Sequence, residues 1–430
     1  MKKCLLFLVF TLLYSNASSQ EKETLKLTPN QIQSIFLEQN LQLIAEKMNI
    51  SLADAEIAQA KLWDNPNISI GGVNLWSTNK QREGESEVIP PLFGSFAKNT
   101  QFSIELSQLI QTANKKGKLV AREKITKEIA IQEFEIVLKG LKLELRKSIN
   151  EIIYLQSYSD ILKRQQEYLS QLIESYRKQV SQGNIAKSEL LRLQSSLLEV
   201  ENENNDTSVE LNEQLKDLKI LLSINPLASI QIEKDIINEI NPASLTLTQL
   251  LQQAEENRAD IKKSKLQTKY FEKSLSYEKS QRIPDITISA SYDRFGGVWK
   301  DFVGFGISFD LPVSNRNQGA IKAARLNHNQ SLYMEKQQIN QVQHEVVEAY
   351  TNYLQAYNFY QKISNNQLLT ELDSMLEIYT KNLLNKNVSM VEYIDFMDTY
   401  RSNKQTFLTA EKKIQTQFEE LQYTIGTEIK

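Results

Sequence analysis

The sequence predicts a mainly α-helical chain with a small β part, built from one helix–strand–strand–helix–helix unit that occurs twice. Two observations predict this fold class. First, the 430 residues include only 13 glycines and 8 prolines, whereas glycine alone usually makes up ~7% of a chain. Because residues that break helices are scarce and Leu, Ile, Lys, Glu and Gln are frequent, long helices are favoured. The second observation is an internal repeat.

Short segments recur in the same order in the two halves of the chain. The matching pairs are 27–32 with 245–250, 66–70 with 284–288, Tyr176 with Tyr379, and 184–186 with 387–389. The first two pairs lie 218 residues apart and the last two 203, so the second copy is expected to have a tighter central hairpin. We predict a first repeat over 20–240 and a second over 241–430.

The first 19 residues are predicted to be a signal peptide. Two lysines precede an apolar stretch at 5–13, and small residues follow, with cleavage after Ala17 or Ser19. A membrane anchor is the alternative, but an apolar stretch this short cannot cross ~30 Å of hydrocarbon as a helix. We therefore expect the chain to leave the cytoplasm.

The composition argues against several function classes. The 50 basic and 53 acidic residues give a net charge of −3, so the chain lacks the basic excess of a protein that coats nucleic acid. Cys4 is the only cysteine, and His328 and His344 are the only histidines, which excludes a disulfide framework and a Cys/His metal site within one chain. The sequence contains no recognisable catalytic constellation. We expect no enzyme activity, no cofactor and no resident metal.

Each repeat is predicted to contain two strands, at 67–76 and 100–109 and at 285–295 and 301–312. Apolar side chains alternate there with small or polar ones, which indicates strands with one apolar face. Alternation over ~10 residues is typical of transmembrane barrel strands, and a hairpin packed on a protein core would show the same pattern. The positions predicted to face lipid are Ile286, Ile288, Phe305, Ile307 and Phe309.

Long helices are predicted around each strand pair. Their ranges are 117–180 and 185–223 in the first repeat and 319–384 and 388–426 in the second, with shorter helices before the strands near 30–62 and 245–282. A helix of about 64 residues is roughly 96 Å long. In the helix predicted over 319–384, apolar residues recur at spacings of three and four, which indicates a coiled-coil seam. The seam residues are Ile339, Val342, Val346, Ala349, Tyr353, Ala356, Tyr360 and Ile363.

The predicted strands cannot close a barrel within one chain, since ~8 strands is the smallest practical number. Open strand edges cannot lie in lipid because their backbone groups would lack hydrogen-bond partners. Two copies would supply 8 strands and three copies 12, of which only the larger set leaves room for a lumen. An exported chain that combines such strands with helices of roughly 100 Å is expected to form a conduit across the bacterial periplasm.

These features together resemble the TolC family of outer-membrane efflux ducts. The resemblance rests on the signal peptide, the duplicated unit, the strand starts at 66–70 and 284–288, and the segment 309–313 that leads into 315–321. Within the family, the chain is most similar to the CzcC/CusC branch of RND-type heavy-metal or cation exporters. The resemblance implies a homotrimer in the outer membrane, with a 12-stranded transmembrane β-barrel and a long α-helical coiled-coil barrel in the periplasm. It also implies two partners, a periplasmic adaptor (membrane fusion protein) and an inner-membrane RND pump.

The resemblance assigns roles at the helical turns. Glu392 and Asp395 match the family's acidic residues at the inner mouth, where three copies would form an electronegative ring that selects cations. Two solvated acids on a helix face are the alternative. The turn residues expected to contact the adaptor are Gly183, Asn184, Ile185, Lys386, Asn387 and Val388. Lys386 stands where the family usually has glycine, so the second turn is expected to differ in shape from the family's turn.

The predicted function is a passive duct of a tripartite efflux system, with metal cations as the expected cargo. A drug-efflux or type I protein-secretion duct of the same fold is the first alternative. A secreted coiled-coil scaffold without a pore is the alternative from a different class.

Overall fold

The computed structural model describes most of the chain as two compact units. The described residues are 24–74, 101–234, 240–296, 299–365, 368–385 and 387–429. One unit comprises the described parts of Met1–Glu46, Phe134–Ala259 and Asn340–Lys430, and the other those of Lys47–Glu133 and Asp260–Ile339. The predicted signal peptide at 1–19 and the predicted tip residue Lys386 lie outside the described residues.

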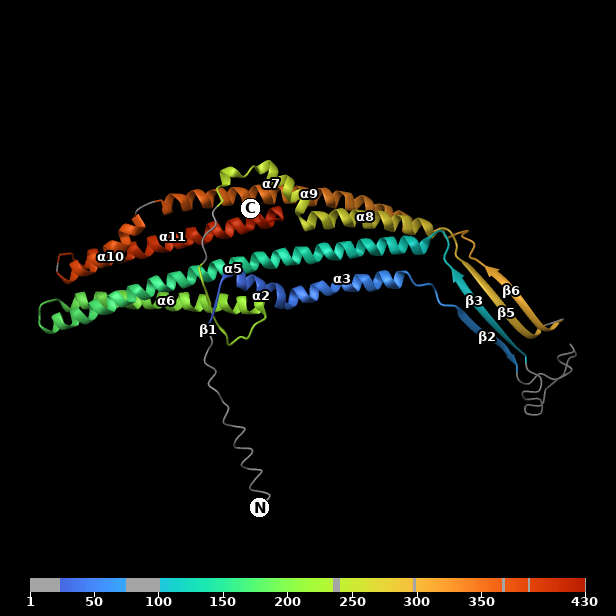
Figure 1. Ribbon diagram of the computed structural model, residues 1–430, viewed down its shortest axis with the longest axis horizontal. Helices are drawn as coiled ribbons and strands as arrows, with labels where there is room; N and C mark the ends of the chain where they lie inside the picture. Colours follow the sequence, from blue (N-terminus) through green and yellow to red (C-terminus); the bar gives the residue numbers. More distant parts are fainter. Residues whose placement is uncertain are drawn as a thin grey trace, which may run out of the picture. The chain divides into compact units, whose positions relative to one another are not determined.

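The fold is mainly helical with a small β part, as the sequence predicts (Figure 1). The helices are α2 (Pro29–Gln39), α3 (Leu41–Ala60), α5 (Lys115–Ser181), α6 (Lys187–Leu222), α7 (Leu247–Asn257), α8 (Ala259–Ser280), α9 (Gln318–Ser364), α10 (Leu368–Leu384) and α11 (Met390–Ile425), with a 3₁₀ turn at Pro242–Ser244. The strands are β1 (Thr24–Leu27), β2 (Asn67–Asn74), β3 (Gln101–Ile110), β4 (Ser229–Ile232), β5 (Ile286–Gly296) and β6 (Trp299–Ser308). No helix within these ranges has the length and apolarity needed to cross a membrane.

The four predicted strands form one antiparallel sheet in the order β2-β3-β5-β6. The central β3–β5 pair joins the two repeats. Only residues 297–298 separate β5 from β6, whereas 75–100 separate β2 from β3, so the second hairpin is the tighter one. The strand predicted at 301–312 ends earlier, at Ser308. Its partner β5 begins only at Ile286, after a proline that cannot donate to the ladder.

A second, two-stranded sheet was not predicted. β1 pairs in parallel with β4, and Ile230 and Ile232 of β4 are buried in a core with Ile32 and Phe36. Four residues are too few for an alternation pattern to stand out in a sequence.

The helices that precede the strands are interrupted, so the single helices predicted near 30–62 and 245–282 are wrong. Asn40 separates α2 from α3, and Arg258 separates α7 from α8. Both residues have extended backbone dihedrals, with ψ of 114° and 123°. Both are buried and bound to distant segments, so tertiary contacts override the local preference for one continuous helix.

The single helix predicted over 319–384 is also wrong. α9 ends at Ser364 and α10 begins at Leu368, with residues 366–367 outside the described part of the chain. The hydroxyl of Ser364 and the side-chain amide of Asn365 donate to the carbonyl and the side chain of Gln361. The N–H of Asn365 still donates to the carbonyl of Gln361, so the last backbone hydrogen bond of α9 is formed at its end.

The helices of the two repeats correspond in length and position. α2 and α7 each have 11 residues and begin 218 positions apart, at Pro29 and Leu247. α6 and α11 each have 36 residues and begin 203 positions apart, at Lys187 and Met390. These are the two offsets of the sequence matches, so each position of one repeat has a definable counterpart in the other.

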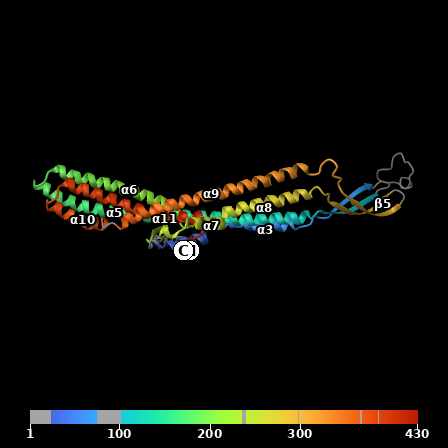
Figure 2. The same ribbon diagram turned by 90° about the horizontal axis from the view of Figure 1, so that it is seen from above.

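A shared hydrophobic core joins the two helical hairpins. Buried residues of α5, α6, α10 and α11 form one cluster, and Figure 2 shows these helices side by side. The predicted seam of α9 is confirmed by burial of its six central residues, Val342, Val346, Ala349, Tyr353, Ala356 and Tyr360. The seam spacing therefore identified the face of α9 that packs inward.

Candidate functional site

Most large apolar side chains of the four-stranded sheet lie on one face, while Phe302 and Leu109 lie on the other. The strand register places Ile307 opposite Ile288, and Phe305 opposite Ala290. It continues across the sheet from Ala290 to Leu106 and from there to Ile68. Residues that pair directly across antiparallel strands share a face, so the predicted one-sided alternation is confirmed.

This apolar face is exposed to an unusual degree. Phe305 is 86% exposed and Ile307 72%, and Phe309, one residue beyond β6, is 55% exposed. Ile288 is also exposed, while Ile286 is half-buried. Exposed apolar patches of this kind mark surfaces that contact a membrane or another protein.

The opposite face carries small and polar side chains. Ser289 lies opposite Gly306, Ser291 opposite Gly304, and Ser103 opposite Gly71. A methyl group added to Gly306 would lie 2.7 Å from the Ser289 hydroxyl, so a larger residue could fit there only if that serine shifted. The two faces of the sheet are thus chemically distinct.

The turn between α5 and α6 is a glycine-ended helix terminus. Gly183 has a φ of +74°, its N–H donates to the carbonyl of Val180, and the N–H of Asn184 donates to that of Gln179. This is the hydrogen-bond pattern of a Schellman motif, in which glycine tolerates the left-handed backbone. Ile185 is half-buried against the hairpin core, and Asn184 is exposed.

The turn between α10 and α11 closes in a similar way. The N–H of Asn387 donates to the carbonyl of Asn382, the counterpart of the Asn184 bond. Asn387 is exposed and Val388 is half-buried. Within the described residues, both predicted tips therefore present an exposed asparagine beside a partly buried aliphatic side chain.

Glu392 and Asp395 are both exposed in the first turns of α11. Glu392 also has a local role that the sequence analysis did not assign. Its carboxylate accepts from the N–H of Ser389, and its own N–H donates to the Ser389 hydroxyl, which forms a capping box. These hydrogen bonds from Ser389 lower the pKa of Glu392. The carboxylate is therefore ionised at neutral pH.

Aromatic residues support the base of this turn. Tyr393 is fully buried, and burial raises its pKa to about 12. Phe396 stacks on Tyr379 with ring centroids 4.2 Å apart. Because one side of α11 is fixed in this way, Glu392 and Asp395 remain on its solvent side.

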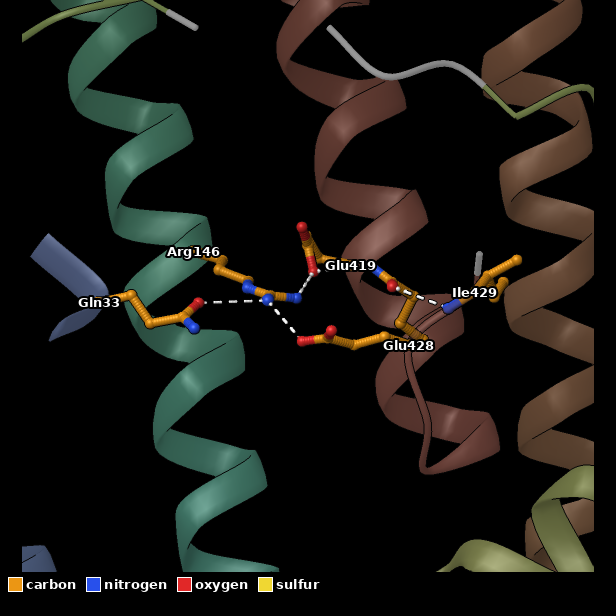
Figure 3. A network of polar contacts seen from close by, with 6 residues as sticks. Gln33, Arg146, Glu419, Glu428 and Ile429 are labelled. Carbon is orange, nitrogen blue, oxygen red and sulfur yellow. Dashed lines mark hydrogen bonds and ion pairs between the residues drawn. The ribbon is translucent and has the colours of Figure 1, made fainter. Parts of the chain in front are cut away.

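A polar network ties the C-terminal segment to two helices (Figure 3). Arg146 of α5 bonds to Glu419 of α11 at 2.5 Å, to Glu428 at 3.0 Å and to Gln33 of α2 at 3.2 Å. The N–H of Ile429 donates to the side chain of Gln422. Burial raises the pKa of Glu419, and Arg146 opposes this rise.

The described residues contain no cluster of three or more His, Cys, Asp or Glu side chains suited to a metal ion. The features present are an exposed apolar sheet face, two helical turns and a pair of exposed carboxylates. Sequence reasoning missed the anchoring roles of Asn40, Arg146 and Arg258, which depend on distant partners. The capping box could have been found from the Ser-x-x-Glu spacing at 389–392.

Comparisons with known proteins give one family and one fold. A family model described as "Outer membrane efflux protein" matches residues 33–222 and 250–427. No curated protein is significantly similar in sequence. The solved structures similar to this chain include the Campylobacter jejuni CmeC outer membrane channel, with a TM-score of 0.74 and 14% identity over 95% of this chain and 90% of CmeC.

Two further structures are similar at comparable levels. CusC, solved in a study of the conformational changes that accompany folding and transmembrane channel formation, has a TM-score of 0.71 and 17% identity over 97% of this chain and 96% of its own. The outer membrane protein VceC from Vibrio cholerae has a TM-score of 0.71 and 16% identity, with 93% and 96% covered. At these identities the likeness establishes the fold, which is the one that the resemblance implied.

Proposed function

Because the chain belongs to the outer membrane efflux protein family, we propose that it is the outer-membrane duct of a tripartite efflux system. The observation that carries the proposal is the sheet with an exposed apolar face drawn from all four strands. In this proposal Ile286, Ile288, Phe305, Ile307 and Phe309 contact lipid. The polar face of the sheet then lines the lumen.

The proposed assembly is a homotrimer. β2 and β6 are the edge strands of the sheet, and each has one side without a partner strand among the residues that the structure describes. Such edges cannot lie in lipid unpaired. Pairing β6 of one copy with β2 of the next satisfies both edges, and three copies then form a 12-stranded transmembrane barrel wide enough for a lumen. The long helices of the three chains form the periplasmic tunnel.

The proposed partners are a periplasmic adaptor and an inner-membrane RND pump. The turns at Gly183–Ile185 and at 386–388 would contact the adaptor. The exposed positions of Asn184 and Asn387 support this assignment, because polar side chains at an exposed turn can contact a partner. Within the chain, the Asn184 amide donates to the side chain of Gln182. The duct itself supplies a path and no energy, so transport depends on the pump.

For the cargo, we propose metal cations, as in the CzcC/CusC branch. The supporting feature is the pair of exposed carboxylates, Glu392 and Asp395, which threefold symmetry would bring together in a ring. A ring of carboxylates favours cations. Drug or protein cargo, carried by a duct of the same fold, predicts no functional dependence on these two charges.

Purification of the full chain from the outer-membrane fraction tests the duct. We expect a detergent-stable trimer that gives discrete conductance steps in a planar lipid bilayer. A monomer recovered from the periplasm without detergent would instead support the pore-less scaffold. For the cargo, a strain that lacks the gene should become sensitive to metal salts, and sensitivity only to drugs would overturn the cation assignment.

A further inference from the structure

A cleft lined by four cationic side chains lies where the second hairpin joins its helices. The cleft has a volume of about 560 Å³ and is lined by Arg282, Ser314, Arg316, Gln318, Ile321, Lys322 and Arg325. Arg282 lies between α8 and β5, Arg316 between β6 and α9, and the last two cations on the first turns of α9. Among the described residues, no carboxylate lines the cleft.

None of the four cations forms an ion pair with any residue in the described ranges. Two carboxylates near this junction are engaged elsewhere, because Glu278 accepts from Asn317 and Asp285 pairs with Lys115. Asp310, on the same linker as Arg316, is not among the residues that line the cleft. Arg316 donates through Nε to the carbonyl of Pro312 at 3.2 Å, which leaves its terminal nitrogens available. Four like charges without counterions repel one another, so an anion bound in this cleft would be stabilised by all four.

The fold does not require these charges, as the first repeat shows. Its matching positions carry Asp64 for Arg282, Ala113 for Arg316 and Leu119 for Lys322, yet the same strand-to-helix junction forms. Only Arg122 corresponds to a cation, Arg325. Arg122 is paired with Glu123 at 2.7 Å and lies 5.3 Å from the Tyr277 ring. The first junction has lysines at other positions, of which Lys115 pairs with Asp285 and Lys116 lies 4.0 Å from the Trp63 ring. The cations at 282, 316 and 322 therefore have no counterpart in the first repeat.

Exposed apolar side chains adjoin the cleft along the chain. Ile283 follows Arg282 directly and is 51% exposed, while Leu311 and Val313, just before Ser314, are each 73% exposed. Cationic heads beside exposed aliphatic side chains suit a ligand with an anionic head and an apolar body. Arginine is suited to phosphate because its planar group donates two parallel hydrogen bonds.

We propose that this cleft binds the phosphate headgroup of an anionic phospholipid, with Arg282, Arg316, Lys322 and Arg325 as its ligands. The acyl chains would lie along Ile283, Leu311 and Val313. The inference rests on the proposed function, because the sheet must lie in a membrane for the cleft to meet a lipid. It adds a lipid-specific contact at one end of the strands, present once per chain.

The test is native mass spectrometry of the detergent-solubilised full chain with added phosphatidylglycerol or phosphatidylethanolamine. The parent should retain phosphatidylglycerol preferentially. Arg282→Gln with Arg325→Gln should weaken that binding about 30-fold, which corresponds to about 2 kcal/mol at about 1 kcal/mol per cation. The control, Lys163→Gln with Lys178→Gln, removes two exposed lysine charges from α5 in the other compact unit and should bind like the parent.

Several results would overturn the proposal. Equal phosphatidylglycerol binding by the variant and the parent would mean that the cleft is not the site. Displacement of the lipid by millimolar inorganic phosphate would assign the cleft to free phosphate. Loss of the trimer in the variant, with no lipid preference in the parent, would assign the cations to a contact between chains. Conductance of the same preparations in planar bilayers checks the duct separately, so a conducting trimer without lipid preference contradicts only this inference.

Discussion

The side chain of Asn40 donates a hydrogen bond of 2.8 Å to the carbonyl of Leu221, near the end of α6. Arg258, its counterpart in the second repeat, donates a bond of 3.2 Å to the carbonyl of Thr424, near the end of α11. Both interrupted helices are therefore held at the break by the terminus of a second helix. The two repeats keep this contact although the two side chains differ in size and charge.

We predict that Asn40→Ala destabilises the protein by about 2–4 kcal/mol. The side-chain oxygen Oδ1 of Asn40 accepts from the N–H of Leu43 and caps α3, and loss of a helix cap costs about 1 kcal/mol. The Leu221 carbonyl also loses its Asn40 donor in a site where Asn40 is only 4% exposed, which adds about 1–3 kcal/mol. The thermal midpoint of the purified protein measures the effect.

Asn40→Asp separates the two contributions. Aspartate keeps the oxygen that caps α3 but loses the amide that donates to Leu221. The destabilisation of Asn40→Asp should reflect the lost donor and the burial of a charge. Lowering the pH protonates the aspartate and should remove the cost of the buried charge. A midpoint for Asn40→Ala equal to that of the parent would show that the break needs no anchor.

Much of the fold could be predicted because burial patterns leave regular spacings in the sequence. The alternation around Ile288 and Ile307 gave the strands, and the spacing through Val346 and Tyr353 gave the seam. The breaks at Asn40 and Arg258 were missed because each depends on a hydrogen bond to a distant carbonyl. The carbonyl lies 181 residues from Asn40 and 166 residues from Arg258 along the chain. The residues next to Asn40 or Arg258 in the sequence do not indicate which distant carbonyl will be the partner.

The candidate site was predictable to a different degree. The exposed positions of Asn184, Asn387 and Glu392 agree with a functional turn, but their partners would belong to other chains. The cationic cleft required the three-dimensional junction, since Arg282 and Arg325 are distant in sequence. The Arg146 network was missed for the same reason.

The apolar face of the sheet gives a direct test of orientation. Ile307→Arg should cost about 2–4 kcal/mol if its side chain meets lipid near the bilayer midplane. Ser308→Arg, on the opposite face, should be much milder because a water-filled lumen solvates the charge. The yield of folded trimer in the outer membrane and its stability in urea measure both. Equal effects at the two neighbours would show that the faces are assigned wrongly.

Two glycines should respond in opposite directions to alanine. Gly183→Ala should destabilise by about 1 kcal/mol because a side chain strains the left-handed backbone at φ +74°. Gly140 lies inside α5 with open space around its Cα, so Gly140→Ala should stabilise by up to about 1 kcal/mol. Thermal midpoints of the two variants check this. Destabilisation by both would point to an unrecognised contact at Gly140.

The Arg146 network should give the stability a distinct pH dependence when Arg146 is removed. Burial raises the pKa of Glu419, and Arg146 counteracts it, so Arg146→Ala should raise that pKa further. A carboxyl with a raised pKa in the folded state stabilises at low pH, and this contribution is lost as the pH rises through that pKa. The variant should therefore be destabilised more at about pH 8 than at about pH 5, by about 1–3 kcal/mol at the higher pH.

A second variant isolates the cause of that pH dependence. Arg146→Ala with Glu419→Gln carries no carboxyl at this position, so its thermal midpoint should lack the extra loss of stability that the single variant shows as the pH rises. If the single variant shows no steeper pH dependence than the double variant, Glu419 is not the titrating group.

The last prediction concerns the acidic residues at the start of α11. Glu392 and Asp395 lie one helical turn apart on the exposed side of α11, and three copies around one axis would form a ring of six carboxylates. Within one chain, the hydrogen bonds from Ser389 lower the pKa of Glu392 and keep it charged. Close like charges in a trimer act in the opposite direction. Current through such a mouth should be cation-selective and reduced by multivalent cations.

Glu392→Gln with Asp395→Asn should abolish most of this selectivity and block while the trimer stays folded. Glutamine can replace glutamate in a capping box, so α11 keeps its N-terminal bond. Glu189→Gln is the matched control, because Glu189 holds the corresponding position of the first repeat, and it should leave selectivity unchanged. Reversal potentials in planar bilayers under a salt gradient give the measurement. If the double variant selects cations like the parent, the two acids are solvated side chains on a helix face, and cation selection must arise elsewhere in the assembly.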